Sequence, residues 1–347
     1  MAANEACRLA STFDLIPNTV YKDSDFYFSQ RSYYCEEAMT ITRIITVLCI
    51  LGCCAACAAP EPVSPIDKLA RGNAYYYQKA LTYFAGGCYP KALSYFEDAH
   101  ERYAAADNGI GIAHCLNGIA NVYFRIGDQE SALLLYDETV AAYERIGDTR
   151  SVVRALSNKA AVLIAAQRLA EAAAVLDQID AHSPDSLDLA ALIMKTRALL
   201  LIRQGDAAGA RNMLLNALTH TKKTDPGTRA DILFTLGHLV MPDQPDQACD
   251  YFNQALALDQ SNQAYAQVAK DLKALGICSS ARGMDHKALD YFKRSAKIFA
   301  LNGDSEQIAQ ILPLMEQSAQ KTGTDIQVVL YYIQQWIEGE TEADLCD

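Results

Sequence analysis

A short motif that recurs about every 40 residues constrains the fold of this chain more than any other feature. Most copies place a glycine five residues before an alanine, as in Gly127-Asp128-Gln129-Glu130-Ser131-Ala132. The alanines that mark the copies are 40, 40, 38, 38 and 40 residues apart. They are Ala92, Ala132, Ala172, Ala210, Ala248 and Ala288. A period of this kind predicts a stack of units in which each unit contacts its neighbours.

The residues around each alanine are typical of two helices joined by a tight turn. Glycine readily adopts the left-handed backbone that ends a helix, and the small alanine suits a close crossing with the preceding helix. The third copy has Gln167 in place of the turn glycine. Four residues after each alanine stands a large apolar residue on the same helix face. These residues are Phe96, Tyr136, Leu176, Leu214, Phe252 and Phe292.

The expected first helices carry a pattern of their own. Ile119-Ala120 with Tyr123 shows a large apolar residue, a small residue and then an aromatic one helical turn after the first, and Leu236-Gly237 repeats its start. Over roughly residues 67–300 this pattern resembles the tetratricopeptide family, although the period exceeds that family's usual length of about 34 residues. The resemblance implies an all-α, right-handed superhelical solenoid of antiparallel helix pairs, with about six repeats.

The resemblance also sets the expected boundaries. The solenoid should span 67–303, and helices within 304–338 should cap its last unit, with Tyr331, Tyr332 and Trp336 as the covering residues. Residues 339–347 are expected to form an acidic, frayed tail.

An apolar segment precedes the repeats. Residues 39–57 hold one positive charge, Arg43, followed by a stretch that is shorter than the roughly 20 residues of a transmembrane helix. The positive start and the small residues at its end fit a secretory signal. An uncleaved signal anchor or a buried N-terminal helix is the alternative. Residues 1–38, ahead of Met39, are expected to be a non-native or disordered extension, or else a cytoplasmic one.

The end of this segment resembles a bacterial lipobox, which implies that one cysteine carries a lipid. Cys57 is favoured because cleavage there leaves residues 58–66 as a stiff, proline-rich tether, and Cys53 and Cys54 are the alternatives. No aspartate follows any of the three, which in that family favours the periplasmic face of the outer membrane.

Composition argues against several function classes. The formal net charge is −12 and no lysine or arginine cluster stands out along the sequence, so a nucleic-acid partner is not expected. The CxxC motif of Cys54 and Cys57 has no partner pair downstream, and none of the six histidines has metal-ligand spacing. We therefore expect no metal, no cofactor and no catalytic site.

Some tetratricopeptide proteins clamp a peptide carboxylate with basic and asparagine side chains of successive first helices. Asn121 and Asn158 match such positions, but Asn117, Leu192 and Thr196 replace the basic residues, so the clamp itself is not predicted. A mixed partner groove is predicted instead, although several of its members could simply pack between helices. Its expected lining is Tyr77, Phe84, Asn117, Asn121, Phe124, Arg154, Asn158, Leu199 and Arg203.

Two cysteines fall on helices that should pack side by side. Cys249 opens an expected second helix and Cys278 lies in the next first helix, so an exported protein could join them in a disulfide. Free buried thiols are the alternative.

These observations favour a non-catalytic scaffold that binds a protein or peptide, is anchored by lipid in the bacterial cell envelope and aids assembly of an envelope complex. The alternative is a soluble cytoplasmic regulator or sensor of the tetratricopeptide type. An enzyme-associated or carbohydrate-binding scaffold has no support from particular residues.

Overall fold

The computed structural model describes residues 65–182, 187–221 and 225–338, which belong to one compact unit, Ser64–Asp347. Several predictions fall outside these residues. They concern the extension 1–38, the signal segment 39–57 with Cys53, Cys54 and Cys57, residues 58–64 of the tether, and the tail 339–347.

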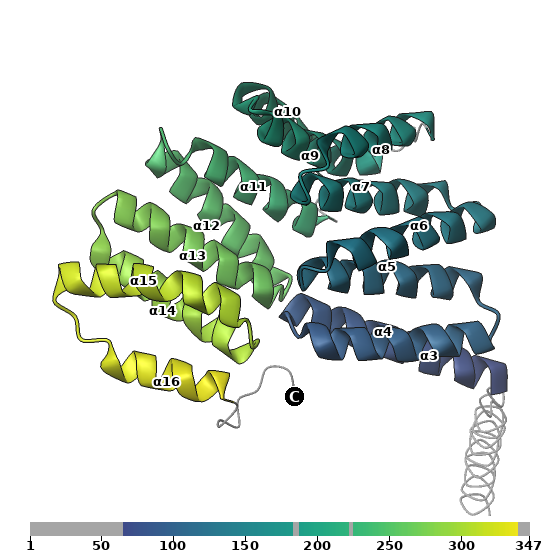
Figure 1. Ribbon diagram of the computed structural model, residues 1–347, viewed down its shortest axis with the longest axis horizontal. Coiled ribbons are helices and arrows are strands. Elements are labelled where there is room, and N and C mark those ends of the chain that lie inside the picture. Colours follow the sequence, from purple (N-terminus) through teal and green to yellow (C-terminus); the bar gives the residue numbers. More distant parts are fainter. Residues whose placement is uncertain (1–64, 183–186, 222–224, 339–347) are drawn as a thin grey trace, which may run out of the picture. The chain divides into compact units, whose positions relative to one another are not determined.

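The described residues form α-helices joined by short connections, with no strand among them (Figure 1). The first helix begins at Pro65, inside the predicted tether. The helices are α3 (Pro65–Gly86), α4 (Tyr89–Ala105), α5 (Gly109–Arg125), α6 (Gln129–Ile146), α7 (Thr149–Ala165), α8 (Leu169–Ala181), α9 (Leu187–Gln204), α10 (Ala207–His220), α11 (Pro226–Val240), α12 (Pro245–Ser261), α13 (Tyr265–Ala281), α14 (Asp285–Leu301), α15 (Ser305–Thr322) and α16 (Gln327–Ile337).

The helices pair along the sequence as the repeat predicts. α3 packs with α4, α5 with α6, and so on to α13 with α14, and most second helices also pack on the first helix of the next pair. Six pairs therefore correspond to the six copies of the motif. The prediction of an all-α repeat superhelix is confirmed.

The six repeat alanines are all fully buried, and the large residues four positions later are buried with them. The facing positions on the first helices are equally small, which lets each pair cross closely. At two of them even a methyl group would not fit. A Cβ on Gly237 would lie 2.5 Å from the Phe252 ring, and one on Gly276 would lie 2.3 Å from the Phe292 ring.

The recurring glycine-aspartate dipeptide ends one helix and begins the next. Gly127 and Gly205 take the left-handed conformation, with φ of 89° and 88°. The following Asp128 accepts a hydrogen bond from the Ser131 backbone N–H at 3.1 Å, and Asp206 caps α10 in the same way. The glycine thus meets the steric requirement of the turn, and the adjacent aspartate meets the hydrogen-bonding requirement at the start of the next helix.

Gln167 adopts the same left-handed conformation, with φ of 61°, without being a glycine. A side chain in this region costs roughly 1–2 kcal/mol, partly offset because glycine makes the unfolded chain more flexible. Gln167→Gly should therefore stabilise the protein by about 0.5–1 kcal/mol in urea unfolding. Gln204→Gly, at the helical end of α9 next to the equivalent turn, is the matched control and should destabilise it. Equal effects of the two changes would contradict this explanation.

The end of the array is capped differently from the prediction. α15 and α16 both pack on α14, close to the expected boundaries. On α16, Ile333 is the buried residue, whereas Tyr331 and Tyr332 are 60% and 50% exposed. Of the predicted covering residues, only Trp336 packs against the last hydrophobic cluster, because a helix of three turns presents one narrow face to α14.

The first pair also contacts a much later part of the array. α3 lies against α13, and the turn after α3 approaches the end of α14. A Cβ on Gly87 would lie 2.7 Å from Asn302 Nδ2 and 3.2 Å from the Ala266 Cβ. Within the described ranges, no helix has both the length and the apolar character needed to span a membrane.

Candidate functional site

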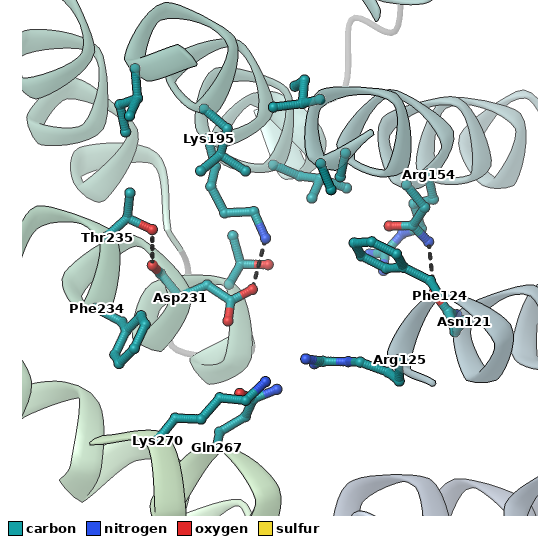
Figure 2. Close-up of a pocket in the computed structure, with 18 of the residues that line it drawn as sticks. Asn121, Phe124, Arg125, Arg154, Lys195, Asp231, Phe234, Thr235, Gln267 and Lys270 are labelled. Carbon is teal, nitrogen blue, oxygen red and sulfur yellow. Dashed lines mark hydrogen bonds and ion pairs between the residues drawn. The ribbon is translucent and has the colours of Figure 1, made fainter. Parts of the chain in front are cut away.

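The first helices of all six pairs line one groove of about 930 Å³. Every odd-numbered helix from α3 to α13 contributes side chains to it, while Tyr136 of α6 comes from a second helix. Figure 2 labels lining residues from α5, α7, α9, α11 and α13. The lining residues are Phe84, Asn117, Asn121, Phe124, Arg125, Tyr136, Arg154, Asn158, Ala161, Ile164, Ala165, Leu192, Lys195, Leu199, Ile202, Arg203, Thr228, Asp231, Phe234, Thr235, His238, Leu239, Gln267 and Lys270.

The structure brings together eight of the nine residues predicted for the partner groove. They are Phe84, Asn117, Asn121, Phe124, Arg154, Asn158, Leu199 and Arg203. Tyr77 lies elsewhere. Its ring packs between Phe96 and His114, at centroid distances of 5.8 and 6.0 Å, and it is therefore a helix-packing residue.

A hydrogen-bonded group of amides lies on the α5 side of the groove. The Tyr136 hydroxyl donates to Asn121 Oδ1 at 2.6 Å, and Asn158 Nδ2 donates to the same oxygen at 3.5 Å. Burial raises the pKa of Tyr136, so its hydroxyl keeps the proton that it donates. The Asn121 oxygen is therefore already bound, and the Asn121 side chain lines the groove.

Asn117 lies one helical turn earlier and also lines the groove. Its Oδ1 is buried and accepts no hydrogen bond from any described residue. Buried polar atoms of this kind are uncommon, because an unmet acceptor costs about 1–3 kcal/mol. Asn117 and Asn121 therefore place two amide side chains about one helical turn apart in the lining of the groove.

The groove also gathers basic side chains. Five cations line it against a single carboxylate, that of Asp231. They are Arg125, Arg154, Lys195, Arg203 and Lys270. No basic cluster stands out along the sequence, because these residues come from four helices that are far apart in it.

Three of the cations point toward the space beside Asp231 (Figure 2). Lys195 Nζ pairs with Asp231 Oδ2 at 2.7 Å, while Arg125 and Lys270 form no ion pair with any described residue. Burial and then the neighbouring Arg125 lower the pKa of Lys270 to about 8. Partial enclosure in the groove would raise the pKa of Asp231, but Lys195 and the more distant Arg125 and Lys270 hold it below its usual value. The site is thus a region of positive potential.

The tetratricopeptide repeat family model matches residues 71–145, which cover most of α3 and all of α4 and α5, and end one residue before α6 does. This chain contains tetratricopeptide repeats. No curated protein matches its sequence.

Three solved structures show how other proteins use the same architecture. The Rap conjugation gene regulator of plasmid pLS20, in complex with the Phr* peptide, has a TM-score of 0.54 at 14% identity, over 82% of this chain and 80% of that one. A Rap protein complexed with Competence and Sporulation Factor has a TM-score of 0.50 at 16% identity, covering 72% and 75%.

The third is a signal transduction ATPase with numerous domains that carries a tetratricopeptide repeat sensor, from Pyrococcus horikoshii. Its TM-score is 0.53 at 14% identity, over 73% of this tetratricopeptide repeat protein. The match spans only 38% of the ATPase chain. At these identities the likeness concerns the fold.

The histidines of this tetratricopeptide repeat protein take packing roles where they are best enclosed. His238 stacks edge-on with Phe234 and Phe252, at centroid distances of 4.5 and 5.0 Å, and burial lowers its pKa. His114 Nδ1 lies 2.7 Å from the Tyr143 hydroxyl. Across the described residues, no group of three His, Cys, Asp or Glu side chains could hold a metal ion.

Cys249 and Cys278 are joined in a disulfide that links α12 to α13, with 5.8 Å between their Cα atoms. Cys115 is a free, buried thiol. Neither cysteine of the disulfide lines the groove.

Proposed function

We propose that this tetratricopeptide repeat protein is a non-catalytic scaffold that binds an extended peptide segment along the groove of its first helices. The observation that carries this proposal is a set of amide side chains, those of Asn117, Asn121 and Asn158, that line one groove among apolar residues. A peptide unit has one N–H donor and one C=O acceptor, and an extended segment presents them without internal hydrogen bonds.

The walls of the groove suit the side chains of such a segment. Phe84, Phe124, Phe234 and Leu199 give apolar contact area between the polar groups. A groove of about 930 Å³ lies in the size range of sites that enclose a small ligand or a short segment. The Rap regulator in complex with the Phr* peptide supports the proposal, because it shows that the same fold accommodates a peptide.

Peptide binding can be tested on the full chain with a fluorescein-labelled pool of random hexapeptides. Asn121→Ala should weaken binding about tenfold, because a hydrogen bond to a buried partner contributes about 1.5 kcal/mol. Fluorescence polarisation measures the change. Asn216→Ala, on the exposed surface of α10 and outside the groove, should leave the affinity unchanged. Equal affinities of the two variants would contradict the role given to Asn121.

We further propose that the protein is exported and anchored by a lipid on Cys57, with Cys53 and Cys54 as alternative sites, and that it aids assembly of an envelope complex at the outer membrane. The segment 39–57 supports this, and so does the Cys249–Cys278 disulfide, since structural disulfides persist mainly in oxidising compartments. Palmitate labelling that globomycin blocks, and that Cys57→Ser abolishes, is the expected result in bacterial cells.

A soluble cytoplasmic regulator or sensor is the second candidate function. The Rap conjugation gene regulator and the sensor-bearing ATPase, which share the fold, favour it. An unlabelled protein in the cytosolic fraction, with Cys249 and Cys278 reduced in mass spectrometry, would support this candidate against the anchored one.

A further inference from the structure

We propose that the peptide held in this groove is acidic, and that Asp231 lies beside the position of a ligand carboxylate and opposes its binding. This inference rests on the proposed function, because it names the class of peptide that the same groove takes. It predicts that removal of an acidic residue from the groove strengthens the binding of an acidic ligand.

The first step is the imbalance of charge. The whole chain carries a formal charge of −12, yet its groove has five cations and one carboxylate. Four of the five, all except Lys195, form no ion pair with any described residue. Cations held close together in a partly enclosed site repel one another, and Arg125 adds to the lowering of the Lys270 pKa that burial causes. An anion that entered the groove would relieve the repulsion.

The second step is the position of Asp231. Its carboxylate binds Lys195, and its side chain is half exposed to the groove, 49% by surface. Arg125 from α5 and Lys270 from α13 point toward the same space (Figure 2). A ligand carboxylate that bound these two cations would lie beside Asp231 and be repelled by it. Asp231 therefore lowers the affinity for acidic ligands.

The third step decides between a peptide and a nucleic acid, which are both anionic. A long polyanion would have to leave the groove across an exterior that carries the protein's negative charge, where like charges repel it. A short acidic segment places its few carboxylates inside. The Asn117 and Asn121 amides beside the cations also match a peptide backbone. These cations lie at Arg125, Lys195 and Lys270, away from the Asn117, Leu192 and Thr196 positions where the family's carboxylate clamp would need basic residues.

The test uses the full chain and three pools of labelled hexapeptides with amidated C-termini. The pools share the same random neutral positions and carry two fixed Asp, two fixed Asn or two fixed Lys residues. The Asp pool should bind at least about tenfold more tightly than the Asn pool at low salt, and sodium chloride should reduce this advantage. Asp231→Asn should strengthen binding of the Asp pool about three- to tenfold and leave the Asn pool unchanged.

Loss of a groove cation should weaken the preference for the Asp pool, opposite to the effect of Asp231→Asn. Arg125→Glu should abolish the preference for the Asp pool, and Lys270→Met, which keeps the apolar stem, should reduce it. Arg145→Glu is the matched control, because Arg145 is exposed on α6 outside the groove and should leave the preference intact. Far-UV circular dichroism of each variant shows that it is folded.

Three results would overturn the inference. If the Asp and Asn pools bind equally and Asn121→Ala weakens both, the groove is a peptide site without acidic preference, and the proposed function stands alone. If no pool binds, both proposals fail. If single-stranded oligothymidylate displaces the Asp pool at lower concentration than unlabelled Asp peptides do, the anionic ligand is a nucleic acid.

Discussion

Phe252→Ala should lower the free energy of unfolding by about 3–5 kcal/mol. Phe252 is fully buried on α12, where its ring contacts Phe234 and His238 of α11 and fills the space above Gly237. Truncation leaves a cavity between two helices that the repeat holds at a close crossing, so the surroundings can relax only partly. A loss of this size is a large fraction of the stability of an ordinary domain.

The measurement is urea unfolding followed by far-UV circular dichroism. Leu134→Ala, at a position that is 69% exposed on α6, serves as the control and should change stability by less than about 0.5 kcal/mol. In a Gly237→Ala background, Phe252→Leu should destabilise less than it does alone, because the added methyl occupies space that the ring vacates. Additive effects of the two changes would contradict the close packing of this pair.

The second large effect concerns pH. Asp271→Asn should raise the free energy of unfolding by about 2–4 kcal/mol at pH 8, and by progressively less toward pH 4. Asp271 of α13 and Asp259 of α12 are buried side by side in hydrogen-bond contact. Burial, and then the carboxylates of Asp259 and Asp231, raise the pKa of Asp271 to about 9, although the neighbouring Lys270 lowers it. Burial and Asp231 raise the pKa of Asp259 to about 7.

The sign follows from proton binding. Both values exceed the pKa of about 3.9 of an aspartate in an unfolded chain, so the folded protein binds more protons than the unfolded chain over this range. The contribution of these two carboxyl groups to stability is therefore greatest below about pH 4. This contribution is lost as pH rises through about 7 and about 9. Asparagine at position 271 removes most of this dependence because it does not titrate.

Thermal unfolding from pH 5 to pH 9 checks this prediction. The melting temperature of the natural protein should fall across the range, and that of Asp271→Asn should stay flatter. Asp250→Asn, an exposed change on α12, should follow the natural protein at every pH. Parallel curves for the natural protein and Asp271→Asn would show that the carboxyl pair does not bind extra protons in the folded protein.

The sequence predicted the repeat and most of the groove because both depend on periodicity. Once the alanines set the register, positions such as Asn121 and Asn158 fall on the same face of successive first helices, and the structure places both in the groove. Tyr77 shows the limit of this reasoning. Its position in the repeat does not reveal that its ring turns toward Phe96 and fills a gap in the core.

Features that depend on contacts between distant helices were not visible in the sequence. Arg125 ends α5 and Lys270 lies in α13, and each looks like an ordinary surface cation until stacking brings both to one groove. Asp259 and Asp271 look like solvent-exposed carboxylates for the same reason, although the packing of α12 on α13 buries them. Only the distance between helices, which no local pattern records, identifies such pairs.

The contact between Gly87 and the region of Ala266 and Asn302 has a consequence for how this protein could change in evolution. An open array can gain or lose a unit and keep every interface of the remaining ones. Here α3 rests on α13, so duplication or deletion of any unit between them would draw these two surfaces apart. Growth by tandem duplication, the usual route by which repeat proteins diversify, would therefore cost this molecule an interface. The contact between α3 and α13 therefore favours the present number of units.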